Sequence, residues 1–301
     1  MNFLGARLLL IASAWSVASA GVVMRQAGKL NPSPVLERNQ RLDTGRSKRE
    51  VAVPLRGRRV VLHVYLPKQV QPNASLVVFS SGSGGWHDFD DYVATALAEN
   101  GLPVCGISTH SYLTNFYNTS RPATIEQLVA DYSDIIKESK VVVGIENSRP
   151  IILAGWSLGA GYAPIIASQS SIKPNVLGVI SIAIEKDNEA ALSIGNRLLT
   201  RLTGRMFGPS FDIVQYLPRV SPRPVAIIQA AADHKASPQK ANEMITAAGQ
   251  AASTVRVFEV KSARGHSFAG GRPEFKQTLS EVLAWFKSTL EPHQYEFTPV
   301  D

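Results

Sequence analysis

Residues 150–168 read PIILAGWSLGAGYAPIIAS, and this stretch decides the fold. The apolar run Ile151–Ala154 predicts a buried strand, and the residues from Leu158 onward predict a helix. The turn between them carries Gly155-Trp156-Ser157-Leu158-Gly159, a G-x-S-x-G motif at a strand-to-helix junction. Gly155 and Gly159 suit such a turn because it leaves no room for Cβ atoms against the neighbouring strand and helix. The pattern therefore predicts a nucleophilic Ser157, raised above the edge of a sheet.

The chain around this motif alternates strand and helix patterns. Strands are expected at 50–55, 58–66, 76–81, 103–107, 150–155, 176–183, 225–231 and 255–260. Helices are expected at 88–100, 123–140, 158–168, 239–248 and 273–290. Such alternation predicts a mostly parallel central sheet with helices on both faces. Residues 185–222 break it with short helix-like pieces at 189–203 and 210–217, which predicts a small helical insertion that acts as a lid or binding loop.

A serine nucleophile needs a base, and the base needs an acid to orient it. Asp233 directly follows the expected strand 225–231, and His266 lies in the loop after strand 255–260. The chain order Ser157, Asp233, His266 is the order expected for this type of fold. We therefore expect these three residues to form a catalytic triad.

The remaining histidines are weaker candidates for the base. They are His63 in an early strand, His87 and His110 in loops, His234 beside Asp233, and His293 in the tail. Because no two histidines have metal-ligand spacing, we expect no metal site, and no pattern calls for a cofactor.

Acyl transfer also needs donors for a tetrahedral oxyanion. We expect the backbone N–H of Leu158, directly after the nucleophile, to be one of them. The second is expected from the loop Gly82-Ser83-Gly84-Gly85, at the N–H of Ser83, with Gly82 and Gly84 allowing close approach of the backbone. Trp86 and Trp156, which flank the two motifs, are expected to contact substrate.

These residues also carry a family resemblance. Ser81-Gly82-Ser83-Gly84-Gly85-Trp86, followed by Asp88 and Asp90, resembles the S-G-D-G-G-W signature of the VirJ/AcvB bacterial virulence-protein family. The similarity covers residues 58–290, including 101–104, 121–123, 155–160 and the region of His266. It implies an exported α/β-hydrolase, similar also to dienelactone-hydrolase-like esterases. It further implies hydrolysis of aminoacyl-phosphatidylglycerol, such as lysyl-phosphatidylglycerol, at the periplasmic face.

The chain departs from the family pattern at two positions. Ser83 and Gly161 stand where the family usually has acidic residues. Carboxylates at these positions could pair with a lysyl ammonium group, so their absence weakens the lysyl-lipid assignment. Neither departure affects the expected triad.

The first twenty residues have the features of a secretory signal peptide. Arg7 precedes the apolar run Leu8–Val17, and Ala18-Ser19-Ala20 predicts cleavage after Ala20. An uncleaved membrane anchor is the alternative. With Cys105 as the single cysteine, no intramolecular disulfide can form, and we expect a periplasmic or secreted protein.

The net charge of +7 is concentrated near the N-terminus, because residues 21–60 hold ten basic and three acidic side chains. We expect residues 21–49 to form a basic, poorly ordered arm, 50–292 the hydrolase domain, and 293–301 a tail. The arm is either a solvated leader or makes peripheral contact with an anionic membrane surface. The nearly balanced remainder of the chain gives no basis for nucleic-acid binding.

The insertion also suggests a substrate contact. Its apolar side chains, Leu202 and Phe211 among them, predict one wall of an acyl- or lipid-facing pocket. Arg197, Arg201 and Arg205 recur four residues apart and could face an anionic headgroup, or form an ordinary solvated face.

The sequence leaves three functional classes open. They are a carboxylic-ester hydrolase acting on a small-molecule or lipid ester, a peptidase or thioesterase with the same triad, and a non-catalytic secretion accessory protein with a hydrolase fold. The triad favours the enzymes, because a scaffold has no need of Ser157 or His266. The sequence specifies neither the physiological substrate nor the oligomeric state.

Overall fold

The computed structural model describes residues 38–41, 47–70, 74–193, 195, 202–203, 208–249 and 254–290. The chain divides into two units, residues 1–34 and 35–301, and every described residue belongs to the second. The strands are β1 (Arg38–Arg41), β2 (Ser47–Leu55), β3 (Arg58–Leu66), β4 (Leu76–Ser80), β5 (Val104–Ile107), β6 (Ile151–Trp156), β7 (Val176–Ile182), β8 (Asp187–Glu189), β9 (Ser210–Asp212), β10 (Val225–Ala230) and β11 (Val255–Val260).

The helices alternate with these strands along the chain. The α-helices are α1 (Asp88–Glu99), α2 (Thr109–Phe116), α3 (Ile125–Val143), α4 (Leu158–Ala167), α6 (Leu217–Val220), α7 (Pro238–Ala248) and α8 (Arg272–Thr289). Two short 3₁₀ helices are η1 (Lys173–Asn175) and η2 (Ile213–Gln215).

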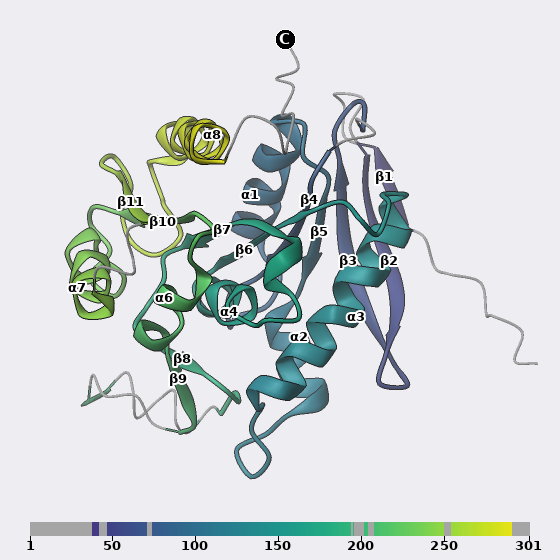
Figure 1. Cartoon of the computed structure of the whole chain (residues 1–301), viewed down its shortest axis with the longest axis horizontal. Helices are drawn as coiled ribbons and strands as arrows, with labels where there is room; N and C mark the ends of the chain where they lie inside the picture. Colours follow the sequence, from purple (N-terminus) through teal and green to yellow (C-terminus); the bar gives the residue numbers. More distant parts are fainter. Residues whose placement is uncertain are drawn as a thin grey trace, which may run out of the picture. The chain divides into compact units, whose positions relative to one another are not determined.

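Among the described residues, nine strands form one sheet in the order β1-β2-β3-β5-β4-β6-β7-β10-β11 (Figure 1). The neighbours from β5 to β11 pair in parallel, whereas β1, β2 and β3 pair antiparallel. Helices α2, α3, α4, α6 and α7 contribute to the core on one face, and α1 and α8 to the core on the other. The predicted mostly parallel sheet with helices on both faces is confirmed.

The strand order reverses direction at β4. The chain leaves β4 for β5 on one side, and β6 lies on the other side of β4. In open parallel sheets, ligands bind outside the carboxyl ends of the strands where the order reverses in this way. The loop after β4 and the turn after β6 therefore meet at the edge where chemistry is expected.

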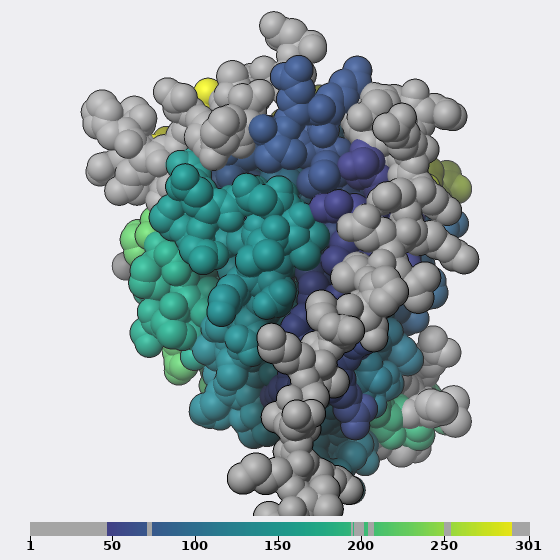
Figure 2. All heavy atoms as spheres, turned by 90° about the vertical axis from the view of Figure 1, so that its right-hand side faces the viewer, coloured from purple at the N-terminus to yellow at the C-terminus, as the bar shows by residue number. Residues whose placement is uncertain are grey.

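The N-terminal boundary differs from the prediction. The expected start of the domain at residue 50 falls inside β2, which begins at Ser47 and pairs with β3 as far as Leu66. Residues 38–41, expected in the arm, form β1 against β2. Residues 38–41 and 47–50 lack the alternation of apolar and polar residues that predicts a strand. They form strands because the backbone of a neighbouring strand offers them hydrogen-bond partners. Strands β2 and β3 form an antiparallel hairpin, and Figure 2 shows atoms from this part of the chain in purple beside those of α3 in teal.

The insertion also differs from the prediction in its described part. The helix expected at 210–217 is replaced by β9, which pairs with β8, and by the short helices η2 and α6. Asp212 accepts a hydrogen bond from the N–H of Val214, which ends the strand and starts η2. Pro218 has no N–H to continue a helix from η2, so α6 begins separately. The small helical insertion is thus, in its described part, a two-stranded ribbon followed by short helices.

Candidate active site

Ser157 lies at the junction of β6 and α4 with φ 55° and ψ −116°. Its N–H donates to the carbonyl of Ile182 at 2.8 Å, which ties the turn to β7. A Cβ on Gly159 would lie 2.0 Å from the carbonyl oxygen of Ser80, and one on Gly155 would lie 2.3 Å from the carbonyl of Gly159. Only glycine fits at either position, as expected for this turn.

The structure brings the three expected triad residues together. The Ser157 Oγ lies 2.7 Å from His266 Nε2, and His266 Nδ1 lies 2.6 Å from Asp233 Oδ2. Ser157 follows β6, Asp233 follows β10, and His266 follows β11, so three separate loops meet at one edge of the sheet. The side chain of Asp233 is 3% exposed and that of His266 is 26% exposed, so the carboxyl is buried while the imidazole is partly accessible.

The environment of Asp233 favours its ionised form. Burial works against the charge, but hydrogen bonds from His266 and from the backbone N–H groups of Lys235 and Ala236 outweigh it and lower the pKa of Asp233. The N–H of Lys235 donates to Asp233 Oδ1 at 2.9 Å. The carboxylate is thus charged, fixed in place and aimed at the imidazole.

Trp156 supports the histidine loop. Its Nε1–H donates to the backbone carbonyl of His266 at 2.9 Å, and its ring centroid lies 5.8 Å from that of the imidazole. The opposite part of the ring packs edge-on against Phe89. The contacts that the structure gives Trp156 thus include His266 and Phe89, and the expected contact with substrate stays a prediction.

Trp86 has its contacts within the protein, and the substrate contact expected for it stays a prediction. Its ring stacks on His63 with 4.2 Å between centroids, and Nε1–H donates to Asp91 Oδ1 at 2.6 Å. The indole also fills the space above Gly106, where a Cβ would lie 1.9 Å from it. Because these partners belong to β3, β5 and α1, the side chain is packed against the sheet rather than aimed at Ser157.

The glycine loop after β4 lies against the serine. A Cβ on Gly82 would be 3.5 Å from Ser157 Cβ and 3.0 Å from the Trp156 ring. Leu158 is the first residue of α4, so its N–H has no acceptor within the helix. The N–H groups of Leu158 and Ser83 therefore belong to two backbone segments that meet at Ser157.

Two histidines that sequence reasoning ranked low contact this loop. His110 Nδ1 lies 2.9 Å from the carbonyl oxygen of Ser83, and His87 Nε2 lies 3.0 Å from that of Gly84. His110 was expected in an irregular loop but belongs to α2. A capping signal could have revealed that helix, because Ser108 Oγ accepts a hydrogen bond from the N–H of Ser111.

The substrate contacts expected in the insertion can be compared with the structure only at some positions. Arg197, Arg201 and Arg205 lie outside the described residues. Phe211 packs half-buried against the core, whereas Leu202 is 74% exposed. The apolar pocket wall expected from this segment is therefore not seen at Leu202.

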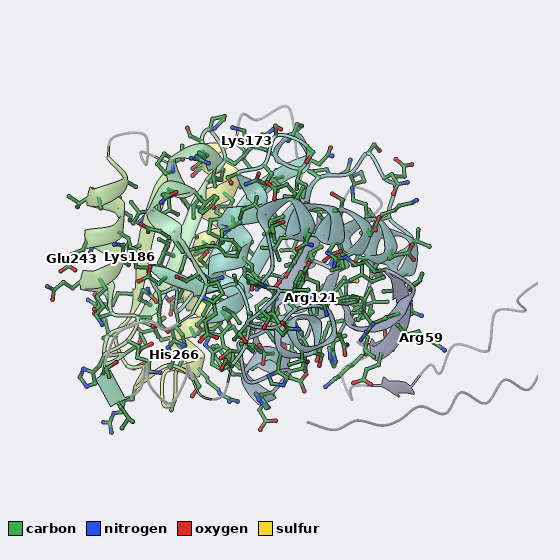
Figure 3. The ribbon with its side chains drawn as sticks, turned by 90° about the horizontal axis from the view of Figure 1, so that it is seen from below. Arg59, Arg121, Lys173, Lys186, Glu243 and His266 are labelled. Atoms are coloured by element: carbon green, nitrogen blue, oxygen red, sulfur yellow. The ribbon has the colours of Figure 1, made fainter. Side chains whose placement is uncertain are left out.

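A cavity of about 480 Å³ opens between the insertion and α7. Its apolar lining residues are Ile184, Val214, Met244 and Ala247. Its charged lining residues carry both signs and are Glu185, Lys186, Asp187, Lys235, Lys240 and Glu243. Figure 3 shows Lys186 beside Glu243, with His266 at a separate position. The lining includes none of the three triad residues, so this cavity is distinct from the site around Ser157.

The described parts of the chain offer neither a metal-binding cluster nor a helix suited to a membrane. Within them, no group of three or more histidine, cysteine, aspartate or glutamate side chains could hold a metal ion. None of the described helices combines the length and hydropathy that a bilayer crossing requires.

Comparisons with solved structures identify the fold. A putative dienelactone hydrolase from Klebsiella pneumoniae subsp. pneumoniae MGH 78578 matches with a TM-score of 0.60 at 15% identity, covering 80% of this chain and 98% of its own. Est1E from Butyrivibrio proteoclasticus matches with a TM-score of 0.58 at 12% identity, covering 79% and 99%. A membrane phospholipase A described as a bacterial virulence factor matches with a TM-score of 0.55 at 13% identity, covering 80% and 87%.

These likenesses show that the chain has the α/β-hydrolase fold, as the sequence predicted. Among curated proteins, none matches the chain. Residues 74–250, which include the glycine loop, the serine turn and Asp233, match the family described as bacterial virulence protein (VirJ). The chain therefore belongs to the VirJ family of bacterial virulence proteins.

Proposed function

We propose that the chain is an exported serine hydrolase that cleaves a carboxylic ester through an acyl-enzyme. One observation carries the proposal, the unbroken series of short contacts from Asp233 through His266 to Ser157, at 2.6 Å and 2.7 Å. Nucleophile, base and orienting acid within hydrogen-bond reach of one another are what this chemistry needs. Ser157, in strained backbone and linked through His266 to the buried carboxylate of Asp233, has no evident use in a non-catalytic scaffold protein.

The ionisation of Asp233 fixes the tautomer of His266. An ionised carboxylate can only accept, so the imidazole carries its proton on Nδ1 and directs the lone pair of Nε2 at Ser157. Nε2 can then accept the hydroxyl proton. The imidazolium that forms is stabilised by the adjacent negative charge.

The reaction proceeds in two halves. Ser157 Oγ attacks the ester carbonyl while its proton moves to His266 Nε2, and the N–H groups of Leu158 and Ser83 stabilise the oxyanion. Collapse of the intermediate breaks the ester C–O bond, and the alcohol leaves with the proton from Nε2. Water then gives a proton to Nε2, attacks the acyl-enzyme, and releases the acid with Ser157 restored.

The family resemblance favours an aminoacyl-phosphatidylglycerol as substrate. The site would then cleave the ester between the amino acid and the lipid glycerol, and Arg197 and Arg201 would face the lipid phosphate. Thioester or amide cleavage uses the same triad and is the alternative within the enzyme class. Residues 1–20 support export to the periplasm or beyond.

Peripheral contact with an anionic membrane is proposed for the arm rather than for the hairpin. Three of the five Lys and Arg side chains in the hairpin of β2 and β3 are already engaged with the body of the protein. Lys48 lies 2.6 Å from Asp91, Arg49 donates to the carbonyl of Val142 at 2.8 Å, and Arg56 lies 2.6 Å from Asp131. The basic residues from 25 to 46 are therefore the better candidates for lipid contact.

The test is hydrolysis by the mature chain against matched variants. The substrates are a short-chain nitrophenyl ester, the corresponding thioester and anilide, and vesicles containing lysyl- or alanyl-phosphatidylglycerol. Ser157→Ala, His266→Ala and Asp233→Asn should each lower ester turnover by about 10³-fold or more. Ser133→Ala, which removes an exposed hydroxyl on α3, is the control and should keep wild-type turnover.

The outcomes separate the hypotheses. Release of free amino acid from vesicles, lost in Ser157→Ala, supports the lipid substrate. Faster cleavage of the thioester or anilide than of any ester overturns the ester assignment. Turnover that is equal in the wild type and Ser157→Ala overturns the serine mechanism.

A further inference from the structure

Ser81 directly precedes the glycine loop, and the proposed reaction gives its hydroxyl no direct role. The residue follows β4 and is completely buried. A buried hydroxyl without partners costs free energy, so such a group is kept where hydrogen bonds hold it. The partners of Ser81 therefore indicate what its side chain does.

The backbone of Ser81 is fixed between the sheet and the serine turn. Its N–H donates to the carbonyl of Ile107 on β5 at 3.0 Å, and its own carbonyl accepts from the N–H of Gly159 at 3.2 Å. Gly159 can approach this closely because it has no Cβ, which would lie 2.7 Å from the carbonyl oxygen of Ser81. Ser81 therefore belongs to the same rigid frame as the turn that carries Ser157.

The hydroxyl of Ser81 connects the start of α2 to the glycine loop. Ser81 Oγ accepts a hydrogen bond at 3.1 Å from the N–H of Thr109, the first residue of α2. The same hydroxyl donates to the carbonyl of Gly82 at 3.2 Å. An N–H can only donate, so Thr109 occupies a lone pair of Oγ and leaves the hydroxyl proton directed at Gly82.

The carbonyl of Gly82 determines the direction of an expected oxyanion donor. This carbonyl and the N–H of Ser83 belong to one planar trans peptide group and point in opposite directions. Holding the carbonyl therefore orients the N–H of Ser83. The peptide also lies close to the nucleophile, since a Cβ on Gly82 would be 3.5 Å from Ser157 Cβ.

A second hydrogen bond reaches the same carbonyl from within the loop. The N–H of Gly85 donates to the Gly82 carbonyl at 3.2 Å. This bond closes a turn inside the glycine loop, so it sets the shape of the loop but moves with it. The bond from Ser81 comes from outside the turn, and it ties the Gly82 carbonyl to the frame that holds Ser157.

We propose that Ser81 is a positioning residue whose hydroxyl holds the Gly82–Ser83 peptide so that the Ser83 N–H faces the oxyanion. The inference rests on the proposed function for its catalytic consequence. A purely structural role is the competing explanation, in which the hydroxyl serves only as an acceptor for the N–H of Thr109 at the start of α2. The two roles differ in what happens to the glycine loop and the oxyanion when the hydroxyl is removed.

The experiment compares Ser81→Ala with Ser80→Ala. Ser80 is the preceding residue, is 2% exposed, and its Oγ lies 2.8 Å from the hydroxyl of Tyr132 on α3. Each replacement therefore removes one buried, hydrogen-bonded hydroxyl from the same segment, but only Ser81→Ala removes a bond to the glycine loop. Ser81→Cys is a second variant, because a thiol is similar in size and only a weak donor and acceptor.

Three readouts are measured for each variant. Amide hydrogen exchange compares residues 82–85 with residues 109–112. Ester kinetics give kcat and KM separately, and a trifluoromethyl ketone, which forms a tetrahedral adduct on the serine, reports on the oxyanion donors.

We expect Ser81→Ala to speed exchange in 82–85 and to lower kcat about 10- to 100-fold with little change in KM. The loss is smaller than that for deleting a donor outright, because the Ser83 N–H remains and only its direction is no longer fixed. Ketone affinity should fall by a similar factor. Ser81→Cys should change in the same direction, and Ser80→Ala should match the wild type in all three readouts.

The other outcomes contradict the proposal. A folded Ser81→Ala with the kcat and ketone affinity of the wild type, or with losses equal to those of Ser80→Ala, refutes the positioning role. Exchange that changes only in 109–112 leaves Ser81 as an acceptor for α2 and also refutes it. Failure of both Ser81 variants to fold assigns the residue to folding instead. A wild-type protein that neither hydrolyses an ester nor binds the ketone refutes the proposed function, while exchange in 82–85 still decides whether Ser81 holds the loop.

Discussion

The backbone of Ser157 gives a sharp prediction about strain. Its φ of 55° with ψ of −116° is a combination that side chains with a Cβ rarely adopt. Holding a non-glycine residue in such a region costs on the order of 1–3 kcal/mol. If the turn stores this strain to present the hydroxyl, then removing the Cβ should release it.

Two variants that both lack the hydroxyl isolate the effect. Ser157→Ala keeps the Cβ and the strain, whereas Ser157→Gly removes both. Glycine costs about 0.5–1 kcal/mol in additional chain entropy relative to alanine. The difference leaves Ser157→Gly more stable than Ser157→Ala by roughly 0.5–2 kcal/mol, or about 1–8 °C in Tm for a domain of this size.

The assay is urea unfolding at 25 °C, supported by thermal unfolding. Ser168, the residue after α4, supplies the control because its φ of −75° and ψ of −12° are ordinary. There the order should reverse, with Ser168→Gly less stable than Ser168→Ala. If glycine is no better than alanine at 157, or if the two pairs behave alike, the turn stores no strain and this reasoning fails.

Three further predictions concern buried positions. Gly159→Ala should destabilise the fold by about 3 kcal/mol or more, because its Cβ would meet the Ser80 backbone. Gly161→Ala should cost less, because the nearest atoms to its Cβ belong to the side chain of Asn188 and not to backbone, and equal losses in urea unfolding would contradict this. Cys105 is completely buried and its pKa is raised to about 12 by burial, so native protein should resist a thiol reagent that reacts readily once the chain is unfolded; fast native labelling would contradict its place in β5. Burial raises the pKa of Asp90 to about 7, so its contribution to stability is present at acidic pH and is lost as pH rises toward about 7. The free energy of unfolding of Asp90→Asn minus that of the wild type should therefore grow by roughly 2–3 kcal/mol between pH 5 and pH 8. A difference that does not change with pH would show that Asp90 titrates as an ordinary carboxyl.

The parallel sheet could be predicted because its strands are buried on both faces. Strands such as Leu76–Ser80 and Val176–Ile182 are buried throughout and apolar except for one serine each, so they stand out from the helices between them. The meeting of Ser157, Asp233 and His266 follows from the same fact, since residues that end parallel strands share one edge. Their places directly after predicted parallel strands were therefore enough to predict that the three residues meet, without any knowledge of side-chain contacts.

The rest depends on contacts that a local pattern does not contain. Strands β1, β8 and β9 are short and polar, and each exists because a partner strand is present. Trp86 stands beside the glycine loop in the sequence, yet its ring turns toward His63 and Asp91.

The most direct test of the account is covalent labelling of the mature chain by a fluorophosphonate, followed by mass spectrometry of the modified peptide. We predict one modified residue, Ser157, with labelling absent in Ser157→Ala and slowed about 10³-fold or more in His266→Ala. No labelling of a folded wild-type chain, or labelling that persists in Ser157→Ala, would contradict the claim that Ser157 is an activated nucleophile.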